Sequence, residues 1–259
     1  MAPAYRIVDQ IDADWLGKLY WDSPVLHAFA VYDRAEFPAQ IAFRVLEKDG
    51  RPVAYLLLWT GAEGSRAVHW LGSEEAPERL AAEFPEPPFT AVVPDGAGPA
   101  IHHRFPAAAI QGVELQVCRS APDPTGSARR LVAADGPALK EFADRSDEPL
   151  GRGFRGRKPE DGYVVGVFED GQLVSVASAM VRLPEVWLIG GVVTQPESRG
   201  RGHAASTTSW LARAALGVGA LPSLYVRDAN TVARSVYQRL GFRPVSHRSW
   251  VEVGPPGVA

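Results

Sequence analysis

The strongest constraint on the fold is the run of residues 186–194, which is almost wholly apolar. A strand with so few polar residues is typical of the centre of a sheet that helices cover on both faces. The run leads into a loop rich in glycine and arginine, and a helical pattern follows over residues 203–216. These features predict an α/β protein in which a buried central strand passes through a glycine loop into a helix.

The remaining pattern predicts a mixture of strands and helices in both halves of the chain. Asp49 with Gly50, and the Glu-Asp-Gly triplet at 169–171, are hairpin turn signals between apolar runs. The predicted helices cover residues 13–20, 76–83, 135–144 and 231–240. The predicted strands cover residues 41–47, 53–59, 67–71, 89–93, 113–118, 163–168, 173–180, 223–226 and 250–253.

A break near the middle of the chain predicts two domains. Residues 120–127 contain two prolines, a glycine and small polar residues between two strand-like runs. A length of 259 residues, of which 46% are hydrophobic, is enough for two globular domains at about 150 residues each. We therefore predict a strand-rich α/β domain over residues 1–122 and a second domain over residues 123–259.

Charge and cysteine content limit which classes of partner and which cellular compartment the sequence predicts. The 27 basic and 30 acidic residues give a net charge of −3, which predicts neither a nucleic-acid nor an anionic-membrane partner. The single cysteine, Cys118, excludes an internal disulfide and fits a reducing compartment. No apolar run approaches the roughly 18 residues of a membrane span. We expect a cytoplasmic protein with a small-molecule or peptide partner.

The loop after the apolar run has the properties of a phosphate-binding turn. Gly200 and Gly202 let backbone N–H groups turn toward one point, and the following helix presents unpaired N–H groups at the positive end of its dipole. Arg199 and Arg201 add positive charge. The same glycines could simply make a tight turn, so the loop alone does not decide between these interpretations.

A second motif about thirty residues later favours the binding interpretation. It consists of Asn230, Ala233, Tyr237 and the pair Gly241-Phe242, on a predicted helix that a glycine ends. Together with the loop at 199–204 and the Val-Thr-x-Pro pattern at 193–196, this motif resembles the GNAT superfamily of N-acetyltransferases. The resemblance covers roughly residues 128–253.

The resemblance implies a GNAT-like fold in which an acyl-CoA lies between two splayed parallel strands, here 186–194 and 223–226. It implies acetyl-CoA as the cofactor and a set of residues that would bind it. Backbone N–H groups would bind the pyrophosphate, the end of the central strand would pair with the pantetheine arm, and Asn230 would contact the cofactor or order a water. The implied residues are Val192, Val193 and Thr194 on the strand, and Arg199, Gly200, Arg201, Gly202, His203 and Ala204 in the loop and helix.

The family chemistry implies transfer of the acetyl group to a primary amine by direct attack in a ternary complex. By the resemblance, the N–H near Val192 faces the thioester oxygen, and Tyr237 donates a proton to the departing thiolate. Relatives often have a glutamate two residues before the Gly-Gly pair, but this chain has Leu188 there, and Glu185 is expected on the opposite strand face. The alternative is therefore a non-catalytic acyl-CoA-binding or regulatory protein. Oligomeric state is left open.

Other candidate motifs carry less weight. Residues 151–156 have the Gly-x-Gly-x-x-Gly spacing of a dinucleotide site, but no strand precedes them and no amphipathic helix follows. Four cations in this segment either steer an anionic acceptor or are simply solvated; they are Arg152, Arg155, Arg157 and Lys158. His102 and His103 are expected on a strand, where they would point to opposite faces, so with His69 they do not predict a metal site.

The first half lacks the glycine loop. After its own central strand the chain has Gly-Ser-Glu-Glu-Ala-Pro at 72–77, which is acidic and has no glycine pair. We expect this half not to bind CoA. It is either a degenerate copy of the same fold or a separate α+β domain.

Overall fold

The computed structural model describes residues 3–61, 64–120, 122–123, 125–147, 149–160 and 163–254. The chain forms two compact units. The first contains the residues up to Glu114, residues 227–229 and the residues from Ser246 onward, and the second contains Leu115–Val226 and Asn230–Val245. Each unit thus takes in residues from both halves of the sequence.

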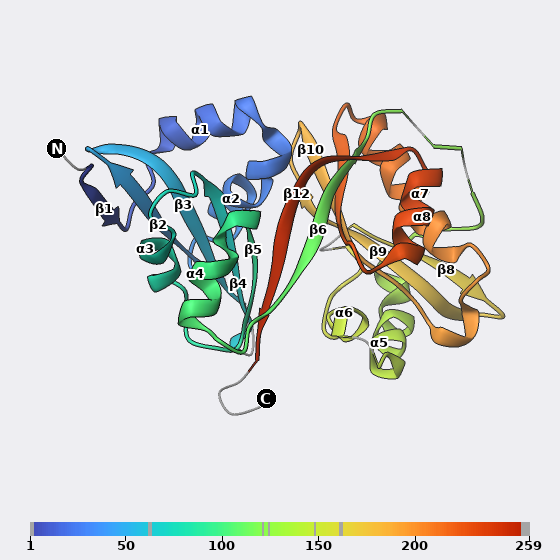
Figure 1. Cartoon of the computed structure of the whole chain (residues 1–259). Coiled ribbons are helices and arrows are strands. Elements are labelled where there is room, and N and C mark those ends of the chain that lie inside the picture. Colours follow the sequence, from blue (N-terminus) through green and yellow to red (C-terminus); the bar gives the residue numbers. More distant parts are fainter. Residues whose placement is uncertain are drawn as a thin grey trace. The chain divides into compact units, whose positions relative to one another are not determined.

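The first unit is a mixed sheet with helices on both faces (Figure 1). Its strands follow the order β1-β2-β3-β4-β5-β12, with β4 and β5 parallel and the other neighbouring pairs antiparallel. The strands are β1 (Tyr5–Val8), β2 (Ile41–Lys48), β3 (Arg51–Thr60), β4 (Arg66–Gly72), β5 (Phe89–Val93) and the end of β12 (Phe242–Val253). The helices are α1 (Ala13–Asp22), α2 (Pro24–Glu36), α3 (Pro77–Ala82) and α4 (Gly98–Arg104).

Both faces of this sheet are apolar because β3 has apolar residues at successive positions. Side chains of a strand alternate between faces. Leu56 therefore packs in one cluster with residues of α3 and α4, and Tyr55 and Leu57 pack in another with residues of α1 and α2. All three side chains are fully buried.

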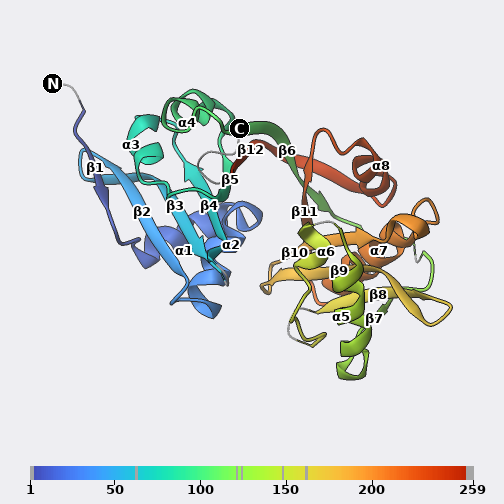
Figure 2. The same ribbon diagram turned by 90° about the horizontal axis from the view of Figure 1, so that it is seen from below.

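The second unit has the same architecture (Figures 1 and 2). Its strand order is β6-β11-β10-β9-β8-β7, with β10 and β11 parallel. The strands are the end of β6 (Ala109–Cys118), β7 (Arg129–Arg130), β8 (Val164–Glu169), β9 (Gln172–Arg182), β10 (Val186–Thr194) and β11 (Leu221–Arg227). The helices are α5 (Gly136–Arg145), α6 (Pro149–Arg152), α7 (His203–Gly217) and α8 (Thr231–Arg239). Residues of α7 and α8 pack on one face of the sheet, and residues of α5 pack on the other.

The order of elements is the same in the two copies of the sequence. Each runs strand, two helices, three strands, helix, strand, helix, strand, first as β1 to β6 and again as β7 to β12. The last strand of each copy completes the sheet of the other: Ser249–Val253 of β12 pair with β5, and β6 neighbours β11. The first half is therefore a second copy of the fold.

Most predicted elements are present, and β5, β10 and the start of α7 have the predicted bounds. The pattern does not predict α2 or α4, so the first half contains more helix than expected, and in the second half it does not predict α6. The expectation that His102 and His103 lie on a strand is wrong, because both belong to α4. Proline near the start of α2, at Pro24, and of α4, at Pro99, is a helix-start signal that the strand-rich interpretation overlooks.

Candidate functional site

Strands β10 and β11 separate part-way along their length. They pair from Val186 with Leu221 to Ile189 with Leu224, and the parallel register ends there although β10 continues to Thr194 and β11 to Arg227. On its other edge β10 is irregular against β9 between Gly190 and Val193. The second half of β10 is therefore not paired with β11, and we call this unpaired stretch between the two strands the gap.

Two glycines lie at this irregularity, and Gly191 is the one that its backbone conformation and its neighbour require. A Cβ on Gly190 would lie 2.1 Å from Met180 Sδ, and a Cβ on Gly191 would lie 2.8 Å from Phe154 Cζ. Gly191 also has a φ of +60°, which an L side chain rarely adopts. The Gly-Gly pair thus lets two apolar side chains lie directly against the backbone of β10.

Phe154 gives the Gly-x-Gly-x-x-Gly segment a structural role. Its ring is buried in the cluster that includes Val193, and the segment begins within α6 instead of following a strand. Arg152 donates to the carbonyl of Asp147 (2.6 Å), and Arg155 pairs with Asp144 (3.0 Å). The segment therefore packs against the central strand and lacks the setting of a dinucleotide site.

The loop after β10 is open where its glycines lie. Gly200 and Gly202 have φ values of +77° and +84°, and a Cβ on either would meet nothing within 4 Å. Gly202 is the N-cap of α7 and offers no side chain to the N–H groups of the first turn. Those N–H groups have no partner within the helix and lie at the positive end of its dipole. The loop is a cradle of backbone donors that fits an anion.

A carboxylate at the end of β8 holds this loop. Glu169 Oε2 accepts hydrogen bonds from Ser198 Oγ and Arg201 Nη1, both at 3.0 Å, and Oε1 lies 3.0 Å from His203 Nε2. Burial raises the pKa of Glu169, but the hydrogen bonds and positive charges around it outweigh burial and hold that pKa below its usual value. The carboxylate is therefore ionised at neutral pH.

The sequence pattern does not identify Glu169 as a site residue, because the Glu-Asp-Gly triplet predicts only a turn. A signal was nevertheless available. In a hairpin followed by a third antiparallel strand, the first and third strands run in the same direction. The end of β8 must therefore lie at the same edge of the sheet as the end of β10, where the loop begins.

The strand residues that the resemblance singles out flank the gap. Val192 packs against the cluster beneath α7 and α8, and Val193 is buried in the cluster on the other face. Thr194 Oγ1 lies 2.9 Å from Ser175 Oγ, and the carbonyl of Thr194 accepts from Arg199 Nε at 3.1 Å. The side chains here are held by packing and hydrogen bonds, so the backbone of β10 is fixed in place.

Tyr237 lies in the same buried cluster that Val192 contacts. It is 7% exposed and packs 6.0 Å from the Phe242 ring, centroid to centroid. Burial raises the pKa of its phenol to about 12. Its hydroxyl has no hydrogen-bond partner among the residues that the structure describes. The phenol is thus protonated and available to a ligand at neutral pH.

Asn230 has a structural role that its sequence position also predicts. It is the N-cap of α8, and its Oδ1 accepts from the N–H of Ala233 at 3.0 Å. Its side chain is exposed. Asn230 therefore fixes the start of the helix that carries Tyr237.

Comparisons with known proteins agree with this geometry. The model of the FR47-like protein family matches residues 164–251. No curated protein sequence matches the chain. A GCN5-related N-acetyltransferase from Sphaerobacter thermophilus is 14% identical, with a TM-score of 0.63 and 96% of each chain covered. A tandem GNAT protein from the clavulanic acid biosynthesis pathway is 18% identical, with a TM-score of 0.52, and covers 97% of this chain and 99% of its own.

The chain has the GNAT fold. The predicted resemblance to the GNAT superfamily is confirmed, and so is the α/β fold with splayed parallel strands preceded by a second α/β unit. The fold and the family match together support acyl transfer in general terms.

The first GNAT unit differs at the corresponding junction. Its parallel pair β4 and β5 ends at His69 with Val92, and the next residues of β4 are Trp70 and Leu71, both buried. Arg248 of β12 is also buried and donates to the carbonyl oxygen of Trp70. Where the second unit has two glycines and a gap, the first has large side chains and a guanidinium.

The loop of the first unit has the opposite charge. Glu75 accepts from Tyr5 Oη at 2.6 Å and from Lys48 Nζ at 2.7 Å. Helix α3 then begins at Pro77, which has no N–H, and it ends at Ala82. The negative carboxylates in this loop and the missing N–H of Pro77 make the loop unsuited to bind an anion.

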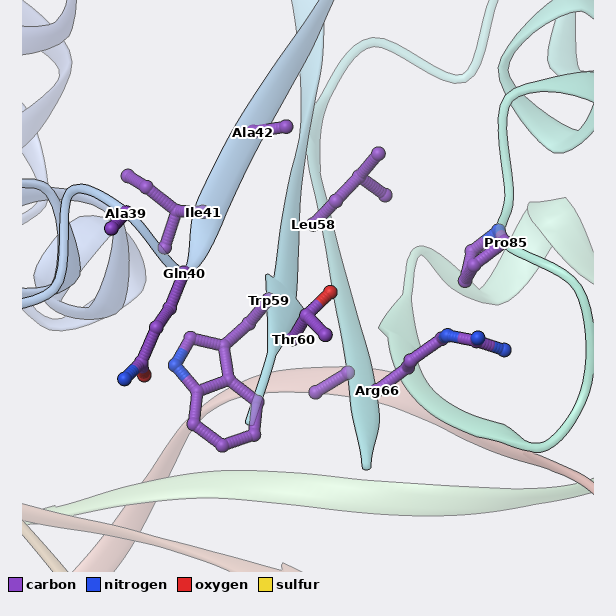
Figure 3. A pocket seen from close by; sticks show the side chains of 10 residues that line it. Ala39, Gln40, Ile41, Ala42, Leu58, Trp59, Thr60, Arg66 and Pro85 are labelled. Atoms are coloured by element: carbon purple, nitrogen blue, oxygen red, sulfur yellow. The ribbon is translucent and has the colours of Figure 1, made fainter. Parts of the chain in front are cut away.

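A pocket of about 240 Å³ also lies in the first unit, at the ends of β2, β3 and β4 (Figure 3). Trp59 and Gln40 line one part of it and Arg66 another (Figure 3). Arg66 donates to the carbonyl of Glu86 at 2.6 Å. None of the site residues that the sequence predicts lines this pocket.

The remaining candidates from the sequence form no site. In the part of the chain that the structure describes, no group of three His, Cys, Asp or Glu side chains is placed to hold a metal ion. Within the same residues, no helix is long and apolar enough to cross a membrane. The candidate site therefore consists of the residues of the second GNAT unit described above.

Proposed function

We propose that the chain is an N-acetyltransferase that uses acetyl-CoA and a primary amine of a small molecule or peptide. The observation that carries this proposal is the junction from β10 to α7. There an open strand edge leads into an open glycine loop at an uncapped helix N-terminus. When bound, acetyl-CoA would supply an activated acetyl thioester.

The binding role belongs to backbone groups. The N–H groups from Gly200 to Ala204 would bind the pyrophosphate, since an uncapped helix N-terminus favours negative charge. The N–H of Arg199 donates to the carbonyl of Pro196 at 3.3 Å, so this residue would contribute through its guanidinium. The free edge of β10 from Val192 to Thr194 would hydrogen bond the pantetheine arm as a neighbouring strand would. Asn230 would support the cofactor site by fixing the start of α8.

Two groups would act on the reacting atoms. The N–H of Val192, on the irregular part of β10, would donate to the acyl oxygen as negative charge develops there. Tyr237 would donate its phenolic proton to the departing thiolate, since the raised pKa of about 12 keeps the phenol protonated. The neutral amine would attack directly, forming the C–N bond as the C–S bond breaks. The proton that the amine nitrogen loses would pass to water, and the Tyr237 phenolate would regain a proton from solvent.

Cys118 is unsuited to a covalent intermediate. It is fully buried, and its Sγ donates to the carbonyls of Ser120 (3.0 Å) and Leu240 (3.4 Å). Burial raises the pKa of the thiol, which disfavours the nucleophilic thiolate. Direct transfer in a ternary complex is therefore favoured over acyl transfer through this cysteine. A free thiol also fits the reducing cytoplasm, where we place the protein.

One observation favours a second function, a non-catalytic acyl-CoA-binding or regulatory protein. Leu188 is buried where related acetyltransferases often have a glutamate. A protein of this kind would keep the loop and the open strand edge and would not turn over. Binding and turnover must therefore be measured separately.

Calorimetric titration with acetyl-CoA, with NAD at the same concentration as a control, tests the binding part. We expect saturable binding of one acetyl-CoA per chain and none of NAD. A thiol-release assay with a panel of amines then tests turnover. No binding would refute both functions, and binding without thiol release from any amine would favour the non-catalytic one.

A further inference from the structure

We infer that Glu169 is a positioning residue for the acyl donor: its carboxylate holds the loop in the form that presents backbone N–H groups to the pyrophosphate. This inference rests on the proposed function. It assigns a role to a residue outside the loop, on a different strand, that touches none of the reacting atoms.

The contacts of Glu169 extend along the whole loop. Ser198 precedes the first glycine, Arg201 lies between the two glycines, and His203 is the first residue of α7. All three side chains converge on the two oxygens of one carboxylate, each at 3.0 Å. The glycines between them are left with open space on their Cβ side. One anchor therefore fixes the side chains while the backbone donors remain open to a ligand.

Arg201 and His203 also explain why a carboxylate is tolerated beside an anion site. An unpaired carboxylate there would repel phosphate, but this one is paired with a guanidinium and an imidazole. The side chain of Glu169 is 28% exposed and that of His203 13%, whereas that of Arg201 is 58% exposed, so the contact with His203 is the better shielded of the two. Shielded, charge-assisted hydrogen bonds restrain geometry more strongly than exposed ones.

The first unit has a similar contact with the charges reversed. Lys48 is the last residue of β2, as Glu169 is of β8, and it donates to Glu75 in the loop before α3. In both units a charged residue at the end of the second strand holds the loop after the fourth. In the first unit the carboxylate lies in the loop, and in the second it lies behind the loop.

An opposite interpretation is that Glu169 competes with phosphate for Arg201. The two interpretations predict opposite changes in the Kd for CoA when the carboxylate is removed. If positioning dominates, removal of the carboxylate weakens CoA binding because the loop loses its shape. If competition dominates, removal frees Arg201 and strengthens CoA binding.

The test is calorimetric titration of the full chain with CoA, which needs no turnover. We compare wild type, Glu169→Gln and Glu169→Ala, with Lys48→Met as the matched control in the first unit. We expect the Kd for CoA to rise about tenfold for Glu169→Ala, and less for Glu169→Gln, which keeps a hydrogen-bond acceptor. Lys48→Met is expected to leave that Kd within about twofold, since the contact it removes is in the other unit.

Kinetics supply a second readout if acceptor turnover is found. A positioning role raises the KM for acetyl-CoA and leaves kcat nearly unchanged. An unchanged or lower Kd for CoA in both Glu169 variants, with wild type binding normally, overturns the inference and leaves the proposed function intact. If wild type binds no CoA, the proposed function fails and the inference fails with it. Glu169→Gln, nearly the same size as the native residue, keeps the test decisive if the alanine variant does not fold.

Discussion

The two GNAT units have the same order of elements but differ sharply where the fourth strand meets its helix. In the second unit Gly190 and Gly191 follow the last parallel pair, and the loop carries glycines and cations. In the first unit Trp70 and Leu71 follow the last parallel pair, and the loop carries Glu75. The strands and helices specify the architecture, and one short junction decides whether that architecture can bind an anion.

The same comparison shows which groups occupy the corresponding place in the first unit. Trp70 is fully buried, and its carbonyl oxygen accepts from Arg248 of the exchanged strand. In the second unit the corresponding stretch of β10 has only half-buried residues from Gly190 to Val192. A buried backbone carbonyl needs a partner. Arg248 supplies one to Trp70 in the first unit, and Ser178 Oγ, 3.4 Å from the carbonyl oxygen of Gly190, supplies one in the second.

The largest effect is expected from Trp70→Ala, which probes the filled junction of the first unit. Removing a fully buried indole should lower the free energy of unfolding by about 3–5 kcal/mol, because a cavity replaces it. Chemical denaturation measures this change, with Trp21→Ala, at a side chain 69% exposed, as a control expected within about 0.5 kcal/mol of wild type. Binding of a second acetyl-CoA by the Trp70 variant would contradict the comparison, since it would show that one side chain alone closes the first unit.

The next largest effect is expected from Gly202→Glu in the open loop of the second unit. The substitution places a side chain at a φ of +84° and a negative charge at the N-terminus of α7. Affinity for acetyl-CoA should fall more than about 100-fold by calorimetry, through lost loop geometry and repulsion of the pyrophosphate. Gly219→Glu is the matched control, with a φ of +83°, open space around it and a place beyond the other end of α7. Equal losses in both variants would mean that strain alone, and no bound anion, explains the effect.

Tyr237→Phe tests whether the second unit is catalytic or only binds. The phenol is the proposed proton donor, so kcat should fall about 100-fold while the Kd for acetyl-CoA stays within about threefold. Thiol release measures kcat and calorimetry measures the Kd. Helix α4, which occupies the place of α8 in the first unit, has no tyrosine. Full activity in the phenylalanine variant would assign proton donation elsewhere.

The smallest effect concerns the contacts that hold the exchanged strand β12 in the first unit. His247 lies 2.7 Å from Asp95 and 2.8 Å from Asp228, and these hydrogen bonds raise its pKa to about 9. A raised pKa stabilises the fold fully below the ordinary pKa near 6.5, and the stabilisation is lost as pH rises through about 9.

Because the side chain is 49% exposed, solvent reduces this stabilisation to about 1 kcal/mol. His247→Gln should therefore be less stable than wild type by about that amount at pH 7 and nearly equal to it at pH 10. Chemical denaturation at both pH values checks this. A difference that persists at pH 10 would show that packing, and not charge, is responsible.

The sequence predicts the second unit better than the first. The bounds of β10 and the open loop at Gly200 and Gly202 are as predicted, because a fully apolar strand and paired glycines are strong local signals. Helix α2 is not predicted, since its apolar residues follow one another too closely to show a clear helical period. The last strand is predicted as residues 250–253 but begins at Phe242, because charged and polar side chains fill its first half.

The features that the sequence does not predict depend on contacts between residues far apart in the chain. Glu169 lies about thirty residues before the loop that it holds, and no local pattern connects the two. The exchange of β6 and β12 between the copies is hidden for the same reason: both are ordinary last strands of one repeat, and local pattern does not name a strand's neighbour.

The exchange of last strands also determines what would happen to the fold if one copy were deleted. Deletion of residues 1–122 would remove β5, the partner of Ser249–Val253, and would leave a row of unpaired backbone groups on β12. It would also remove β6, the neighbour of β11. Each copy closes the sheet of the other, so the loss of either copy would leave the remaining one with unpaired strand edges.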